Sequence, residues 1–249
     1  MASWLSEHSP QTFEGLAIPE KLRQTLTSAS ISATPPNFLI AGPAGVGKTA
    51  SWKLVARQML GPGWRATTHV LQCRDLARTS GAMAKFENFL RPGGIDSSDT
   101  LAGRMSLDAF DRNIISTNSS DVAPAGKEIE LKEGQLPVSR LIVLEDADHL
   151  GHIRQAYLRR MMETVGNASR FILVARAPSR IIDALRSRTQ MIRIPYTSKS
   201  QSIATLESIC AEEKIPPNEG VIGDIVYVCA GNLRKSIFTL EMLNSRGLT

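Results

Sequence analysis

Aromatic residues and cysteines are scarce in this sequence. Aromatic residues make up only 5% of the 249 residues, so large stacking surfaces for unpaired bases are not expected. The three cysteines, Cys73, Cys210 and Cys229, lie far apart without the paired spacing of metal or disulfide motifs, and we expect them to be reduced and buried. A signal peptide and an apolar run of membrane-spanning length are also missing. These absences predict a cytoplasmic protein.

Positive charge, by contrast, is abundant. The net charge is +5 and the isoelectric point is near 9.3, which favours polyanionic partners. Between residues 151 and 199 the arginines and lysines far outnumber the two acids, Glu163 and Asp183. Phosphate is the natural counter-charge, whether it belongs to a nucleotide or to a nucleic acid.

The most informative stretch is Gly42-Pro43-Ala44-Gly45-Val46-Gly47-Lys48-Thr49, which has the pattern G-x-x-x-x-G-K-T of a Walker A loop. It follows an apolar run and precedes a helix-prone segment that begins at Ala50. In such a loop the backbone N–H groups point at phosphate oxygens, and the positive end of the following helix adds to their effect. Lys48 would contact the β- and γ-phosphates, and Thr49 would place its hydroxyl on Mg²⁺. Residues 42–50 are therefore predicted to bind ATP with Mg²⁺.

A second apolar run, residues 140–144, ends in Glu145 and Asp146 and has the Walker B pattern. Packing of the strands should bring these carboxylates beside Thr49. Glu145 is then expected on the metal side, and Asp146 is expected to orient the attacking water.

Strand and helix candidates alternate up to residue 197. The strand candidates are 38–41, 68–73, 140–144, 171–175 and 191–195, and they predict an α/β fold with a parallel five-stranded sheet flanked by helices. Helix candidates alone follow, at 201–213, 220–229 and 232–244. We predict a nucleotide-binding domain over residues 1–197 and a small helical lid domain over residues 198–249. The polar segment 92–139 is expected to be a surface insertion with a hairpin near 128–131.

The segment 153–165 is predicted to be an amphipathic helix. Apolar Ile153, Tyr157 and Met161 share one stripe, and polar residues, among them Gln155 and Glu163, share another.

Taken together, these segments resemble the AAA+ ATPases, and specifically the replication factor C small subunits, which load the sliding clamp onto DNA. The most specific segment, Ala-Tyr-Leu-Arg-Arg-Met-Met-Glu at 156–163, is close to the family's Ala-Leu-Arg-Arg-Thr-Met-Glu. Ser187-Arg188-Thr189 stands where the family has Ser-Arg-Cys, and further matches lie at 61–65, 170–173, 179–182 and 231–235. The resemblance covers most of the chain apart from 92–139.

The resemblance implies roles for two more arginines. Arg188 would be the arginine finger that reaches the γ-phosphate bound by a neighbouring subunit, and Arg234 would be the lid sensor for the phosphate of its own subunit. The alternatives are a structural salt bridge for Arg188 and a solvated helix arginine for Arg234.

The resemblance also implies partners, namely other clamp-loader subunits, the sliding clamp and primer-template DNA, and a nuclear location in a eukaryote. Arg78, Arg154 and Arg180 would follow DNA phosphates without reading bases. Scattered surface arginines are the alternative for any one of them.

The sequence departs from the family in four places. Glu145-Asp146 reverses the family's Asp-Glu, Arg176 replaces the sensor asparagine after the fourth strand, and His8-Ser9-Pro10 replaces Tyr-Arg-Pro. The family's collar domain would lie beyond Thr249, so we expect either a fragment or a subunit that assembles differently.

We predict an ATP-binding clamp-loader small subunit that acts in DNA replication, with hydrolysis slowed by these departures. One alternative is a non-catalytic subunit that donates Arg188 in trans. Another is an unrelated P-loop kinase or nucleoside phosphotransferase, which would leave Arg188 and the lid motif unexplained.

Overall fold

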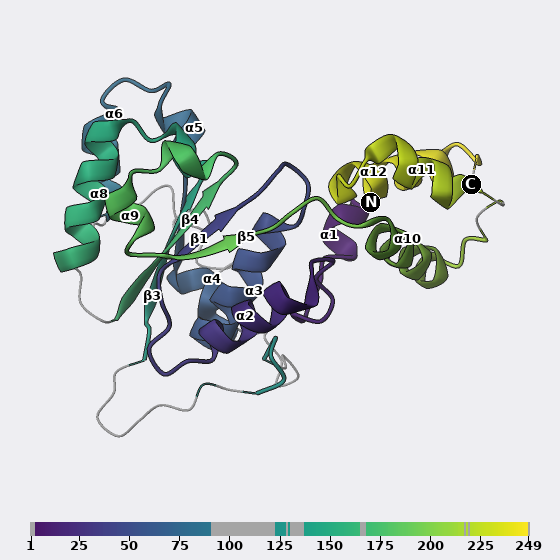
Figure 1. Ribbon diagram of the computed structural model, residues 1–249, viewed down its shortest axis with the longest axis horizontal. Helices are drawn as coiled ribbons and strands as arrows, with labels where there is room; N and C mark the ends of the chain where they lie inside the picture. Colours follow the sequence, from purple (N-terminus) through teal and green to yellow (C-terminus); the bar gives the residue numbers. More distant parts are fainter. Residues whose placement is uncertain are drawn as a thin grey trace, which may run out of the picture.

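A five-stranded parallel sheet lies at the centre of the larger part of the molecule (Figure 1). The structure, a computed structural model, describes residues 3–90, 123–127, 129, 137–164, 168–216, 218 and 220–248. Within them the sheet has the order β2-β3-β4-β1-β5. The strands are β1 (Phe38–Ala41), β2 (Thr68–Gln72), β3 (Arg140–Glu145), β4 (Ser169–Ala175) and β5 (Gln190–Arg193). The predicted parallel five-stranded sheet is confirmed.

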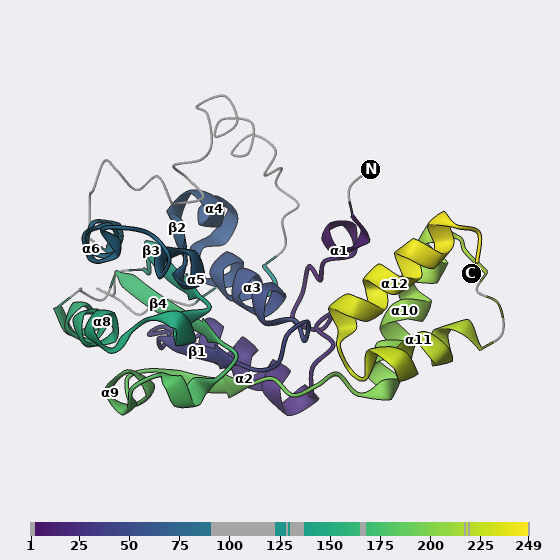
Figure 2. The same ribbon diagram turned by 90° about the horizontal axis from the view of Figure 1, so that it is seen from above.

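Helices cover both faces of the sheet because successive strand residues point to opposite sides. Phe38 and Ile40 of β1 enter one apolar cluster, and Leu39 between them enters another. The first face carries α2 (Glu20–Ser30) and α3 (Lys48–Leu60). The second carries α5 (Cys73–Leu76), α6 (Ala82–Leu90), α8 (His152–Thr164) and α9 (Asp183–Arg186) (Figure 2). Burial on both faces explains why the central strands β1, β3 and β4 are largely apolar, whereas the edge strands β2 and β5 are mixed.

Short elements link these layers. A 3-10 turn η1 (Gly61–Gly63) and helix α4 (Trp64–Thr67) lead from α3 into β2. The turns η2 (Ala147–His149) and η3 (Pro178–Arg180) follow β3 and β4.

Helix α8 faces the core with only part of the predicted apolar stripe, because Tyr157 and Met161 pack against the second apolar cluster but Ile153 does not. Ile153 is 77% exposed, whereas Gln155 is buried with 3% exposure. The Gln155 amide donates to the carbonyls of Leu150 at 2.8 Å and Arg180 at 2.9 Å, and its oxygen accepts from the N–H of Ile182 at 2.8 Å. The placement of Gln155 on the polar stripe was wrong because a buried amide whose hydrogen bonds are satisfied can take a core position.

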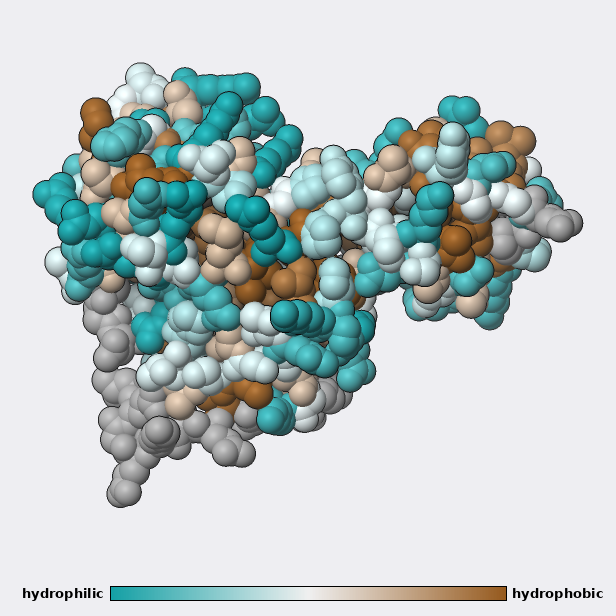
Figure 3. Space-filling model, viewed as in Figure 1, coloured by the Kyte–Doolittle hydropathy of each residue, from teal (hydrophilic) through white to brown (hydrophobic). Residues whose placement is uncertain are grey.

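Three C-terminal helices, α10 (Lys199–Glu213), α11 (Val221–Cys229) and α12 (Leu233–Ser245), pack around an apolar cluster of their own. Ser198 and Gln201 form a reciprocal capping box at the start of α10. The bundle is set to one side of the sheet (Figure 2), and apolar surface is visible on it (Figure 3). The predicted helices are confirmed, while the domain boundary near residue 197 stays a prediction.

The short helix α1 (Trp4–Glu7) packs on this bundle and not on the sheet. Trp4 belongs to the apolar cluster of the three helices, and its backbone N–H donates to Glu241 Oε1 at 3.2 Å. The beginning of the described chain is thus attached to α12.

Most of the predicted insertion 92–139, including residues 128 and 130–131 of the expected hairpin, lies outside the described residues. Residues 123–127 lie against α3, where Gln58 accepts from the N–H of Ala125 and donates to the carbonyl of Lys127, both at 2.8 Å.

The three cysteines are free and buried, as predicted, and burial raises the pKa of Cys73 above its usual range. No helix in the described part of the chain is long and apolar enough to cross a membrane.

Candidate functional site

The carboxyl ends of three neighbouring strands bring the predicted site residues to one edge of the sheet. β1 runs into the loop of residues 42–47, and α3 begins at Lys48. β3 ends at Glu145, and β4 ends just before Arg176. Because the strands are parallel, this edge is where α/β sheets bind ligands.

The loop of residues 42–47, the phosphate loop, packs against the first turn of α12. Gly45 has a φ of +77°, and a Cβ at this position would lie 1.8 Å from Asn232 Oδ1, so glycine is required. The carbonyl of Gly45 accepts from the N–H of Arg234 at 3.1 Å. The Asn232 side chain caps α12 by accepting from the N–H of Lys235 at 3.1 Å. The structure therefore brings Arg234, the expected lid sensor, to the loop.

Lys48 is folded back onto its own loop, where Nζ donates to the carbonyls of Gly42 at 2.8 Å and Pro43 at 2.5 Å. Burial lowers the pKa of Lys48, and the positive charges of Arg176 and Arg234 lower it further, against the opposing effect of Asp146 and Glu145. Three positively charged side chains, Lys48, Arg176 and Arg234, thus lie at the loop. A bound phosphate chain would relieve their mutual repulsion.

The two Walker motifs meet at Glu145. Its Oε1 accepts from Thr49 Oγ1 at 3.2 Å, as the predicted neighbourhood requires. The same oxygen accepts from the indole N–H of Trp52 at 2.6 Å. Sequence reasoning missed Trp52, because a tryptophan in this helix has the pattern of an ordinary core residue.

Asp146, the acid expected to orient water, has an unusual backbone and an ionic partner. Its φ is +50°, a left-handed conformation that costs energy for a residue other than glycine and is often found at functional sites. Arg176 Nε lies 3.8 Å from its Oδ1. The backbone N–H groups of Arg176 and Ala177 donate to the Asp148 carboxylate at 3.3 and 3.4 Å, which holds the chain after β4 against the turn η2.

A pocket of about 330 Å³ adjoins the phosphate loop. Its walls come from residues 5–18, the lead-in before β1, from the phosphate loop and α3, and from α10 and α12. They include His8, Pro10, Ile18, Gly47, Thr205 and Ile237. Its size and its position beside the loop suit the base and sugar of a nucleotide.

His8 is held by two carboxylates of α10. Its Nδ1 lies 2.9 Å from Glu212 Oε2 and its Nε2 lies 2.7 Å from Glu213 Oε1. Burial alone would lower the pKa of His8, but the hydrogen bonds and charges of the two glutamates raise it above its usual value. Among the described residues Glu7, His8 and Glu213 also have ligand atoms within 4.8 Å of one another. The ion pairs of His8 account for this grouping without a metal.

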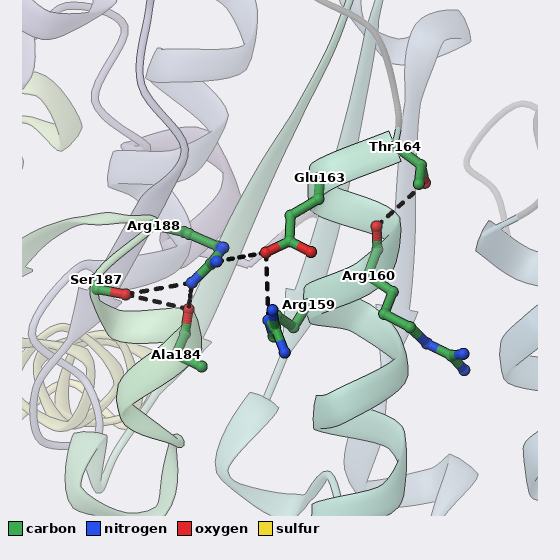
Figure 4. A network of polar contacts seen from close by, with 7 residues as sticks. All are labelled: Arg159, Arg160, Glu163, Thr164, Ala184, Ser187 and Arg188. Atoms are coloured by element: carbon green, nitrogen blue, oxygen red, sulfur yellow. Dashed lines mark hydrogen bonds and ion pairs between the residues drawn. The ribbon is translucent and has the colours of Figure 1, made fainter.

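Arg188, the expected arginine finger, makes its hydrogen bonds with residues of α8, of α9 and of the turn after α9 (Figure 4). Its Nη2 contacts the carboxylate of Glu163, and its Nη1 donates to the carbonyl of Ala184 at 2.7 Å. Glu163 also accepts from Arg159 Nε at 3.2 Å. Burial would raise the pKa of Glu163, but the two arginines lower it below its usual value. Arg188 therefore lies on the outer surface of α8 and α9, with a side chain 35% exposed.

The three arginines predicted to contact DNA come from adjoining elements. Arg78 follows α5, Arg154 lies in the first turn of α8, and Arg180 ends η3. The turn η2 packs against both α5 and η3. Arg78 and Arg180 are exposed, and Arg154 is half-buried. Their contact with DNA stays a prediction.

Two family models match the chain. The ATPase family associated with various cellular activities (AAA) matches residues 38–196, and the RCF1/5-like AAA+ ATPase lid domain matches residues 204–244. Replication factor C subunit 5 of Schizosaccharomyces pombe is 27% identical over 98% of this chain and 65% of its own length. The replication factor C small subunit of Methanothermobacter thermautotrophicus is 28% identical over 98% of this chain and 64% of its own length. The chain thus spans less than two thirds of these relatives.

Among solved structures, the RuvB Holliday junction branch migration motor of Thermotoga maritima is similar in fold. The TM-score is 0.59 at 13% sequence identity, and the match covers 95% of this chain and 65% of that one. The similarity supports the sheet-plus-lid architecture described above.

Proposed function

Because the chain belongs to the AAA family of ATPases, which its match over residues 38–196 shows, we propose that it is a small subunit of a sliding-clamp loader of the replication factor C type. Family membership implies nucleotide binding. The lid match and the replication factor C relatives support the narrower function. The observation that carries the proposal is the contact of the lid with the phosphate loop, where the backbone N–H of Arg234 donates to the carbonyl of Gly45 and the charge of Arg234 lowers the pKa of Lys48. This contact fits a lid that responds to the nucleotide of its own subunit.

The ligand proposed for this site is ATP with Mg²⁺. The backbone N–H groups of residues 42–50, apart from Pro43, which has none, and the side chain of Lys48 would hold the phosphates, and the adjoining pocket would hold the base. Thr49 and Glu145, whose side chains already touch, are the oxygen donors that a small hard cation prefers. When bound, the cation would neutralise charge on the phosphates.

The proposed partners are other clamp-loader subunits, the sliding clamp and primer-template DNA. Arg188 is exposed enough to reach a neighbouring subunit once its contact with Glu163 is exchanged for a phosphate. Arg78, Arg154 and Arg180 would hold DNA by its phosphates, which suits a loader that acts at any primer end.

One observation favours a second candidate, a nucleotide-binding subunit that hydrolyses little and mainly donates Arg188 in trans. Arg176 lies against Asp146, the only acid proposed to orient water. An arginine has five donors and no acceptor, so it cannot take the place of an asparagine that positions water.

The test is steady-state ATP hydrolysis by the purified chain, alone and in a mixed complex with its partner subunits, with and without clamp and primed DNA. Stimulation by clamp and DNA that is lost in Lys48→Ala supports the catalytic subunit. Turnover that appears only in the mixed complex, survives Lys48→Ala and is lost in Arg188→Ala supports the second candidate. Failure of the chain to bind ATP or to enter any such complex would refute both.

A further inference from the structure

We propose that Trp52 is a positioning residue that fixes the carboxylate of Glu145 for a divalent cation at the nucleotide site. The inference rests on the proposed function, because the cation is expected only together with a nucleotide. It adds a residue that the Walker motifs do not contain.

The geometry comes from helix α3. Thr49 and Trp52 are three residues apart, so they share one face of the helix. Their donors converge on a single oxygen, Glu145 Oε1, at 3.2 and 2.6 Å. A carboxylate can accept about four hydrogen bonds, two on each oxygen. With Oε1 engaged by both donors, Oε2 is the oxygen that we expect to face the cation.

The indole of Trp52 is itself fixed in place. It is 2% exposed and belongs to the apolar cluster on the α3 side of the sheet. The ring of Trp64 packs against it edge to face, with centroids 6.5 Å apart. A buried indole N–H needs an acceptor, and Glu145 supplies it, so each group satisfies the other.

The hydrogen bond from Trp52 matters because Glu145 and Asp146 stand in the reverse of the family's order. Glu145 has one more rotatable bond than the aspartate of the family pattern, and an unrestrained glutamate would lose more side-chain freedom on binding a cation. A rigid donor removes that freedom beforehand. Trp52 therefore compensates for the longer acid.

The first experiment measures binding of a non-hydrolysable ATP analogue to the full chain by calorimetry, with Mg²⁺ and with a chelator. Mg²⁺ should tighten binding of the analogue by a certain factor in the wild type, and we expect Trp52→Phe to reduce that factor about tenfold. The affinity in the chelator should be unchanged. Trp64→Phe keeps an aromatic ring against Trp52 and removes an indole that makes no hydrogen bond to Glu145, so it is the matched control and should behave like the wild type. An unchanged Mg²⁺ factor in Trp52→Phe would overturn the inference.

Combination with Glu145→Gln tests whether Trp52 acts through Glu145. In that background Trp52→Phe should have little further effect on the Mg²⁺ factor. An equal loss in both backgrounds would assign Trp52 to packing alone and reject the positioning role.

A second measurement needs no nucleotide. In ¹⁵N-labelled protein the indole N–H signal that disappears in Trp52→Phe should shift in Glu145→Gln, and a signal that stays in place would exclude the hydrogen bond. If the wild type binds the analogue neither with Mg²⁺ nor with the chelator, the proposed function fails. In that case the cation role of Trp52 fails with it, whatever the indole signal shows.

Discussion

Replacing Arg176 by asparagine should increase ATP turnover at the site of this chain. Arg176 Nε lies 3.8 Å from Asp146 Oδ1, where two unit charges interact by about 4 kcal/mol at an effective dielectric constant near 20. The Arg176 side chain is 52% exposed, so solvent screening reduces this to about 1 kcal/mol or less. The substitution should therefore cost little stability while it frees the carboxylate that is proposed to orient water.

The expected gain follows from the acceptor that asparagine supplies. A positioned proton-transfer group contributes about 10²–10⁴-fold to a rate, and recovery of a small part of this would raise turnover at least about tenfold. The assay is phosphate release by the assembled complex in which the sites of the other subunits carry inactive Walker A loops. Nucleotide affinity, measured in parallel, separates an effect on turnover from an effect on binding.

Arg176→Lys is the matched control, because it keeps the positive charge and adds no acceptor. It should be as slow as the wild type. If the asparagine variant binds ATP normally but is no faster than the lysine variant, then Arg176 does not restrain Asp146 and the slow-site hypothesis is refuted.

Three other predictions concern the loop, the lead-in and the surface arginine. Gly45→Ala should weaken ATP binding strongly, because the new Cβ would lie 1.8 Å from Asn232 Oδ1. Gly63→Ala, whose new Cβ would have no neighbour within 4 Å, should leave ATP binding unchanged. Equal affinities of the two variants in a binding titration would contradict this prediction. Because the pKa of His8 is raised in the folded state, its ion pairs stabilise the fold below pH 6.5 and weaken as the pH rises through the folded-state pKa. The melting temperature of the wild type should therefore approach that of His8→Gln above pH 6.5. Melting curves whose difference does not change with pH would count against that linkage. Arg188→Ala should lower turnover at the neighbouring subunit by about 10³-fold or more and leave ATP binding by its own chain unchanged, and undiminished turnover of the complex would rule out the finger.

Much of the fold could be predicted because its signals are local. The central strands β1, β3 and β4 are apolar runs in the sequence, and the loop from Gly42 to Thr49 carries its conformation in its own residue types. The order β2-β3-β4-β1-β5 depends on pairings between distant segments, and only the likeness to a known family could have suggested it.

The errors and omissions arose where polar groups form tertiary contacts. Gln155 was assigned to a polar stripe because periodicity records hydrophobicity and not whether a buried amide finds partners. Trp52, His8 and Glu163 each bind a residue far away in the sequence, so neither spacing nor composition could pair them. The roles assigned to Arg188 and Arg234 stay predictions, although Arg234 does lie at the loop.

The attachment of α1 to α12 couples the two ends of the described chain. Trp4 and His8 are held by α12 and α10, while Pro10 and residues 15–18 border the pocket beside the phosphate loop. Rotation of the three-helix bundle about the strand exit at residues 195–198 would carry α1 with it. The pocket would then change shape both at Arg234, which contacts the phosphate loop, and at the displaced lead-in, so one rotation would move two of its walls.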